Sequence, residues 1–212
     1  MGACCAKSQQ PFDGMSRDYR RRLWLVIAMN AAMFIVEMAA GQAAGSKALQ
    51  ADALDFFGDA VTYGISLAVI GASLRTRALA ALAKGGSLLL MGIWVAVSTL
   101  YQVFVLGVPQ AGVMGSIGFL ALVVNLASVL LLVRYKDGDA NVRSVWLCSR
   151  NDAIGNVAVM IAALGVWGSA TAWPDLIVAG LMATLFVSSS VQILNQGIRE
   201  FRQNSLQTAS AG

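Results

Sequence analysis

Six long apolar segments follow one another along this 212-residue chain, separated by short polar stretches. Each segment is close to the roughly 20 residues that an α-helix needs to cross a bilayer. The pattern predicts an all-α membrane protein, with a six-transmembrane-helix bundle over residues 23–198 between polar tails at 1–22 and 199–212. The predicted spans are Leu23–Ala44, Leu49–Leu74, Leu79–Leu106, Gly112–Val133, Ser144–Trp167 and Pro174–Leu194.

The basic residues predict which ends of the helices face the cytoplasm. Of the 15 lysines and arginines, all except Lys47 and Arg150 fall in the two tails or in the second and fourth connections. Connections rich in lysine and arginine stay on the cytoplasmic side, so we expect both termini to be cytoplasmic. The residues concerned are Lys7, Arg17, Arg20, Arg21 and Arg22, then Arg75, Arg77 and Lys84, then Arg134, Lys136 and Arg143, and finally Arg199 and Arg202.

The composition agrees with a membrane location and excludes several classes of function. Only 12% of the residues are charged and 58% are hydrophobic, whereas a soluble domain is about one quarter charged. We therefore expect a multi-pass protein of the cell membrane, such as a bacterial inner membrane, solvated in part by the lipid bilayer. The chain has no histidine, which excludes histidine-ligated haem and histidine-based catalysis. No nucleic-acid binding is expected, because the basic residues follow the pattern of membrane topology.

Three aspartates in the second predicted span are the strongest functional signal. Asp52, Asp55 and Asp59 are spaced i, i+3 and i+7, so they share one face of a helix. Carboxylates this close in a low dielectric repel one another unless a cation binds or some of them hold protons. Alternatively, each aspartate could cap a helix end or hydrogen-bond to a neighbour, and Asp52 is near enough to the helix start for this.

The fifth predicted span supplies a second pair of candidate ligands. Cys148 and Asp152 are four residues apart and therefore lie on one helix face. A buried cysteine alone is often a small apolar residue, but a carboxylate one turn away favours metal binding. Together with Asp55 and Asp59, these residues would give one sulfur and three oxygen ligands. This set suits Zn(II) or Cd(II), with Hg(II) as a further candidate because of the thiolate.

Other polar residues in the predicted spans have less certain roles. Glu37 lies in the first span, and Arg150 in the fifth could pair with Glu37 or Asp52, or reach the cytoplasmic interface. Asn30 and Asn125 are interpreted as amides that hydrogen-bond between helices.

At these positions the chain resembles the cation diffusion facilitator family of metal/proton exchangers. Residues 46–59 read SKALQADALDFFGD, which is similar to the family pattern S-x-A-L-x-A-D-A-x-[HD]-x-x-x-D. Residues 148–155 read CSRNDAIG and resemble H-x-x-x-D-A-x-G with cysteine in place of histidine. Asn30, Glu37 and Gly41 are similar to the family's N…E…G pattern, and Asn125 lies where an asparagine is frequent.

The resemblance implies a six-helix bundle, generally a homodimer, that moves zinc or cadmium out of the cytoplasm. It assigns the metal site to Asp55, Asp59, Cys148 and Asp152. Two histidine positions of the family site hold Asp55 and Cys148 here, which leaves the preferred ion open. No counterpart of the family's cytoplasmic C-terminal domain follows the sixth predicted span, so we expect no metal sensing by such a domain.

Transport rather than catalysis is the predicted function. No glycine-rich phosphate loop is present, so we expect an ion gradient to drive transport and predict metal/proton antiport, with the metal as cargo and no resident cofactor. The alternative is a membrane enzyme such as a CDP-alcohol phosphotransferase, which also carries a D-x-x-x-D pair. That pattern needs a preceding D-G-x-x-A-R that this chain lacks, so we do not expect an enzyme. Cys4 and Cys5 could capture soft metal ions, carry lipid or have no role.

Overall fold

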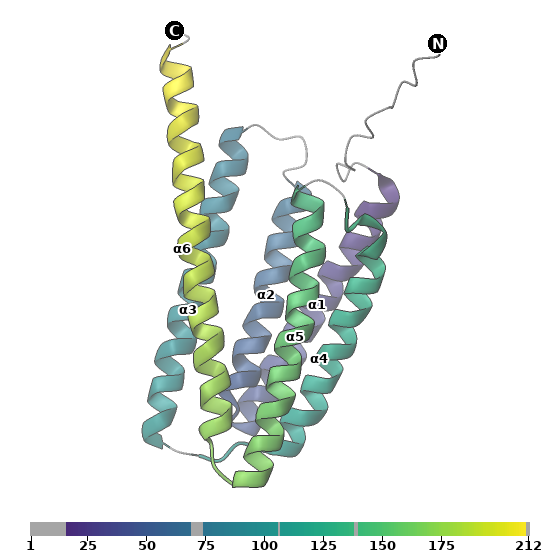
Figure 1. Ribbon diagram of the computed structural model, residues 1–212, viewed down its shortest axis with the longest axis vertical. Helices are drawn as coiled ribbons and strands as arrows, with labels where there is room; N and C mark the ends of the chain where they lie inside the picture. The colour runs from purple at the N-terminus through teal and green to yellow at the C-terminus, as the bar shows by residue number, and fades with distance from the viewer. Residues whose placement is uncertain (1–15, 69–73, 106, 138–139, 211–212) are drawn as a thin grey trace, which may run out of the picture.

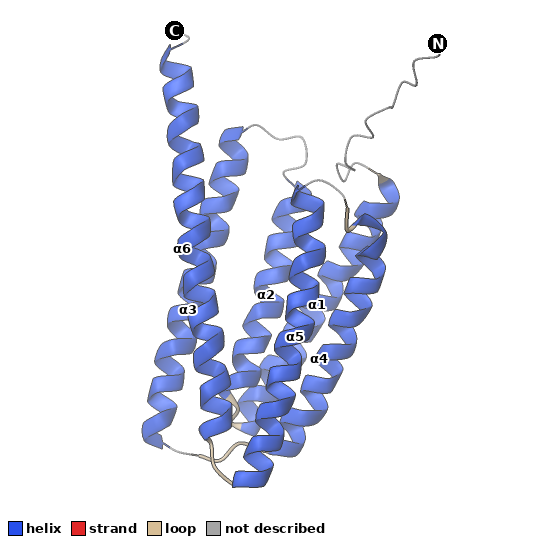
Figure 2. Cartoon of the chain, in the orientation of Figure 1, coloured by secondary structure: helices blue, strands red, loops and turns tan. Residues whose placement is uncertain are grey.

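The computed structural model describes residues 16–68, 74–105, 107–137 and 140–210. Cys4, Cys5 and Lys7 lie outside the described residues, so the hypotheses for the N-terminal tail stay untested. The described chain is helical and contains no strand (Figure 2). Its elements are α1 (Arg17–Ala44), α2 (Lys47–Ala68), α3 (Leu74–Val105), α4 (Ala111–Leu132), the 3₁₀ helix η1 (Val133–Tyr135), α5 (Ala140–Ser169) and α6 (Trp173–Ser210).

Five of these helices are long and apolar enough to cross a membrane, which confirms a helical membrane bundle. The helix that fails this test is α2, because Lys47 and three aspartates lie within its 22 residues. The six-span count therefore stays a prediction. The spans that qualify are Arg17–Ala44, Leu79–Val105, Ala111–Tyr135, Cys148–Ser169 and Trp173–Arg199.

Several helix ends differ from the predicted spans where a polar stretch meets a helix. The helix α1, for example, begins at Arg17, inside the predicted tail of residues 1–22. The second segment was predicted to end at Leu74, but α2 ends at Ala68 and Leu74 begins α3. The helix α6 continues to Ser210, so most of the predicted polar tail at 199–212 is helical. Lys84, taken as part of the second connection, lies inside α3 and within its membrane-spanning stretch.

The helices run side by side, with the start of α1 and the end of α6 at the same end of the bundle (Figure 1). The end of α2, the start of α3, the end of α4 and the start of α5 also lie at this end, which is where the basic residues gather in the sequence. Lys47 begins α2 at the opposite end. This arrangement agrees with the charge pattern, and the assignment of the basic end to the cytoplasm stays a prediction.

Glycines allow α3 and α6 to pack closely against each other. A Cβ atom added at Gly92 of α3 would lie 2.9 Å from Cγ2 of Val187 on α6, and one at Gly85 would lie 2.8 Å from Cγ of Leu194. Any larger residue at these positions would push the helices apart. The helices α3 and α6 therefore form a pair, which runs along one side of the bundle in Figure 1.

A buried carboxyl group joins this pair to α2. Asp175, in the first turn of α6, is 1% exposed and accepts hydrogen bonds from the Ser46 hydroxyl (2.6 Å), the Lys47 N–H (2.8 Å) and the Ala48 N–H (3.1 Å). The two N–H groups belong to the first turn of α2, where backbone donors lack partners within the helix. Asp175 thus caps α2 from another helix and fixes where α2 begins relative to α6.

Candidate metal centre

All four predicted ligands line one cavity of about 420 Å³. Asp55 and Asp59 reach it from α2, and Cys148 and Asp152 reach it from α5. The opposite wall comes from the α3 and α6 pair, including Lys84, Met91, Met182 and Phe186. The i, i+4 spacings in α2 and α5 therefore bring the four side chains to a common space between the two pairs of helices.

Within the cavity, the carboxyl groups interact with one another and with a tyrosine. The carboxyl groups of Asp55, Asp59 and Asp152 lie close enough to interact electrostatically. The Tyr63 hydroxyl donates a hydrogen bond to Oδ2 of Asp59 and lies 3.3 Å from the Ser149 hydroxyl. Oδ2 of Asp152 is buried and has no hydrogen-bond partner. Acidic groups this close together need protons or a cation between them.

The side chains do not surround a single point. Across the described part of the chain, no group of three or more cysteine, aspartate or glutamate side chains stands in an arrangement that could hold a metal ion. The four predicted ligands share a cavity, and rotation of their side chains would be needed to bring them onto one ion. Their assignment as ligands therefore stays a prediction.

Two further residues of this region were not identified from the sequence. Lys84 lines the cavity, donates a 2.9 Å hydrogen bond to the Ser66 hydroxyl, and interacts electrostatically with Asp59 and Cys148. Tyr63 is four residues after Asp59 and on the same face of α2. That spacing could have indicated Tyr63, whereas the position of Lys84 depends on how α3 packs against α2.

Asp52 is not part of the cavity, although its spacing placed it on the same face as Asp55 and Asp59. It is buried elsewhere in the bundle and accepts a 2.6 Å hydrogen bond from Nδ2 of Asn156. The alternative that this aspartate hydrogen-bonds to a neighbour is thus confirmed.

The structure tests the hypotheses for the other polar residues of the predicted spans. The predicted bond between helices is confirmed for Asn125, whose Nδ2 donates to Oδ1 of Asn156 at 2.8 Å. The same prediction is wrong for Asn30, whose side chain donates a hydrogen bond to the Val26 carbonyl of its own helix. Arg150 pairs with neither Glu37 nor Asp52. Its side chain is exposed and lies over the Trp146 ring at 5.5 Å.

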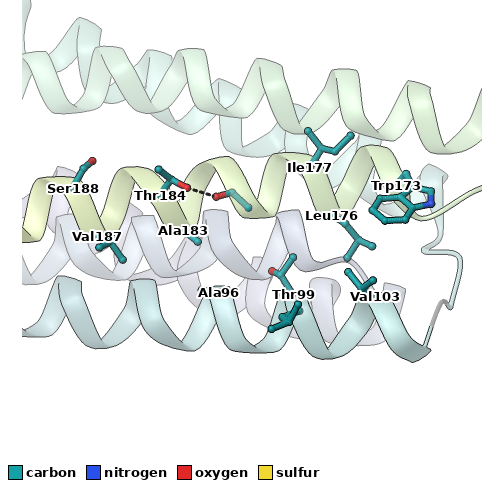
Figure 3. Close-up of a pocket in the computed structure, with 12 residues that line it drawn as sticks. Ala96, Thr99, Val103, Trp173, Leu176, Ile177, Ala183, Thr184, Val187 and Ser188 are labelled. Carbon is teal, nitrogen blue, oxygen red and sulfur yellow. Dashed lines mark hydrogen bonds between the residues drawn. The ribbon is translucent and has the colours of Figure 1, made fainter.

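A second cavity has a chemistry that does not suit a cation. It has a volume of about 570 Å³, lies between α3 and α6, and has no ionisable group among its described lining residues (Figure 3). One polar group there, the Thr184 hydroxyl, is already bonded to the Gly180 carbonyl at 2.9 Å. The lining residues are Ala96, Thr99, Leu100, Val103, Trp173, Leu176, Ile177, Gly180, Ala183, Thr184, Val187 and Ser188.

Acidic residues and a thiol enclosed by membrane helices are typical of multi-pass membrane proteins that handle cations. Residues 23–201 match the family model for the cation efflux transmembrane domain. The chain therefore belongs to the cation diffusion facilitator family and is a multi-pass protein of the cell membrane. This confirms the resemblance seen in the two sequence patterns.

Individual relatives agree with this family. The chain is 27% identical to the metal cation efflux system protein CzcD of Cupriavidus metallidurans, in a match that covers 87% of this chain and 66% of the relative. It is 26% identical to the zinc transporter ZitB of Yersinia pestis, with 88% of this chain and 64% of the relative covered. The chain thus spans a little under two thirds of the length of the curated relatives that it matches.

Proposed function

We propose that this protein exports a divalent heavy-metal cation, Zn(II) or Cd(II), from the cytoplasm in exchange for protons. The observation that supports this best is the single cavity that Asp55, Asp59, Cys148 and Asp152 line from two neighbouring helices. Relatives named for metal cation efflux and for zinc transport support the same class of cargo. Membership of the family favours transport over the phosphotransferase alternative.

The proposed ligands explain why protons would be exchanged for metal. Carboxylate and thiolate groups bind a metal ion only after they lose their protons, so metal and protons compete for one site. Asp55, Asp59 and Asp152 line this cavity together, and in the empty site their carboxyl groups would hold the protons that the metal displaces. Rotation of these side chains and of Cys148 onto one point in the cavity would create the four-ligand set for the metal.

The helix arrangement offers a route to alternating access. One wall of the cavity belongs to α2 and α5, and the other belongs to the closely packed α3 and α6. Movement of one pair against the other would open the site first to one side of the membrane and then to the other. We expect this to occur in a homodimer, as the resemblance to the family implies.

Purified protein in liposomes tests the proposal. An imposed pH gradient should drive Cd(II) or Zn(II) accumulation, and Asp59→Asn or Asp152→Asn should abolish it. Asp137→Asn, which changes an exposed carboxyl group outside the bundle, serves as the matched control and should transport normally. Metal flux that ignores the pH gradient in both directions would exclude antiport, and retained flux in both site variants would exclude the proposed ligands.

A further inference from the structure

A methionine of α3 faces the four candidate ligands from the opposite wall of the metal cavity. Met91 is 8% exposed and lines the same cavity as Asp55, Asp59, Cys148 and Asp152. It does not belong to the ligand set found in the sequence, which came from α2 and α5 alone. The sulfur of a thioether is a soft metal ligand, so a methionine in this position has the chemistry to bind the cargo.

The side chain of Met91 reaches across the cavity to α2. A Cβ atom added at Gly58 would lie 4.0 Å from Sδ and 3.9 Å from Cε of Met91. Asp55, Gly58 and Asp59 all line the cavity and share one face of α2, because residues three and four apart on a helix do so. Since Gly58 has no side chain, the sulfur of Met91 comes close to the α2 backbone between the two aspartates.

Met91 approaches from a direction that the candidate ligands do not cover. All four of them reach the cavity from α2 and α5, and in the described part of the chain they form no group that could hold an ion by themselves. The coordination shell of a metal such as zinc needs donors on several sides of the ion. The thioether of Met91 supplies a donor from α3, on the side that the other ligands leave open.

The other polar and sulfur-containing side chains of the α3 and α6 wall suit a soft cation less well. Lys84 is positively charged and has no lone pair to donate. Ser87 and Ser189 offer neutral oxygens, which suit harder ions, and the Ser87 hydroxyl already donates to the Lys84 carbonyl at 2.9 Å. Met182 also lines the cavity but is part of the apolar core cluster. Met91 is therefore the donor of this wall that best matches a site with a thiolate.

We propose that Met91 is a further ligand of the transported ion, and that its thioether and the Cys148 thiolate together make the site prefer Cd(II) over Zn(II). This inference rests on the proposed function. Two sulfur donors favour the softer of the two ions. A thioether has no proton to lose, so Met91 adds affinity for the metal without changing the number of protons released on binding. The choice of ion is thereby tuned separately from the exchange of protons.

The sulfur neighbours of bound Cd(II) test the inference directly. X-ray absorption at the cadmium edge of the purified, Cd(II)-loaded protein counts them. The unmodified protein should show one sulfur more than Cys148 supplies. Met91→Leu, a substitution that conserves side-chain volume, should lose that sulfur. The control Met114→Leu changes a methionine of the apolar core that does not line the cavity, and its spectrum should match that of the unmodified protein. A single sulfur neighbour in the unmodified protein would overturn the proposal.

Metal affinities separate this inference from the proposed function. In calorimetric titrations, Met91→Leu should bind Cd(II) roughly fivefold to tenfold more weakly and Zn(II) within about twofold of the unmodified protein. The dependence of Cd(II) affinity on pH should keep its slope. An unmodified protein that binds neither ion would contradict the proposed function. Cd(II) binding that weakens in Cys148→Ser but not in Met91→Leu would contradict the role of Met91 alone. Equal losses of Cd(II) and Zn(II) affinity in Met91→Leu would show that Met91 only packs against the site, and this result would also overturn the proposal.

Discussion

Oδ1 of Asp175 accepts a 2.6 Å hydrogen bond from the Ser46 hydroxyl, across 129 residues of sequence. The same carboxyl group accepts the backbone N–H groups of Lys47 and Ala48, so the first turn of the acidic helix α2 is held by α6. Because α2 carries Asp55 and Asp59, the position of the cavity depends on this contact between helices.

Removal of the Asp175 carboxyl group should destabilise the fold more than loss of a surface acid. Asp175→Ala leaves the Ser46 hydroxyl and two backbone N–H groups without their acceptor in a buried region, at a cost of about 1–3 kcal/mol for each unsatisfied group. Thermal unfolding in detergent should show a lower midpoint than for the unmodified protein. The matched variant Asp137→Asn should leave the midpoint unchanged, and an equal midpoint for Asp175→Ala would contradict the capping role.

The Cys148 side chain should set the preference between soft and borderline metal ions. Replacement by serine removes the thiolate and should weaken Cd(II) binding by roughly tenfold or more, with a smaller effect on Zn(II). Cys148→His should move the preference toward Zn(II), because imidazole suits zinc well. Calorimetric titration of each ion measures both changes. Unchanged Cd(II) affinity in Cys148→Ser would remove this residue from the site.

Metal affinity should fall as the pH falls, because protons and metal compete for the same ligands. For each proton expelled on binding, affinity changes by about tenfold per pH unit while that group remains protonated in the empty site. The carboxyl groups of Asp55, Asp59 and Asp152 should titrate as a coupled set. Cd(II) titrations over a range of pH values give the slope. An affinity that stays constant with pH would be incompatible with proton exchange.

Lys84 should oppose metal binding from inside the cavity. Its ammonium group is held by Ser66 and acts on Asp59 and Cys148, so it competes electrostatically with an incoming cation. Lys84→Gln should bind Cd(II) a few-fold more tightly and release it more slowly. The control is Arg150→Gln, which removes an exposed charge stacked on Trp146. Equal effects of the two variants would mean that only the overall charge of the protein matters.

The basic end of the bundle should face the cytoplasm. A reporter that works only in the cytoplasm should be active when it is fused at Leu206, near the end of α6. The reason is that connections rich in lysine and arginine are retained on the cytoplasmic side. A reporter signal from the outside would reverse the predicted topology.

Local spacing in the sequence was sufficient to find the four candidate ligands. Asp55 and Asp59, like Cys148 and Asp152, are four residues apart and so share a helix face, and the structure brings both pairs to one cavity. Spacing could not reveal residues whose roles depend on contacts between distant helices. Asp175 and Lys84 belong to this group.

The charge of a residue alone also did not show how deep in the membrane it lies. Lys84 was counted with the second connection because it is basic, although the predicted span Leu79–Leu106 already contained it, and the structure places it within the membrane-spanning stretch of α3. Arg150 was considered as a partner of Glu37 or Asp52, but the face of α5 that carries it is exposed. In both cases the rotation and register of the helices, which arise from packing, decide where the charge lies.

The aspartates of α2 also affect how the protein enters the membrane. Each carboxylate near the centre of a helix costs about 2.5–3.5 kcal/mol during insertion, so α2 is a poor candidate for partitioning into lipid alone. The turn at Gly45, which adopts a φ of 68° and ends α1, brings α2 directly back against α1. We expect the two helices to leave the insertion machinery as one hairpin, with the acids shielded by α1 until α5 arrives.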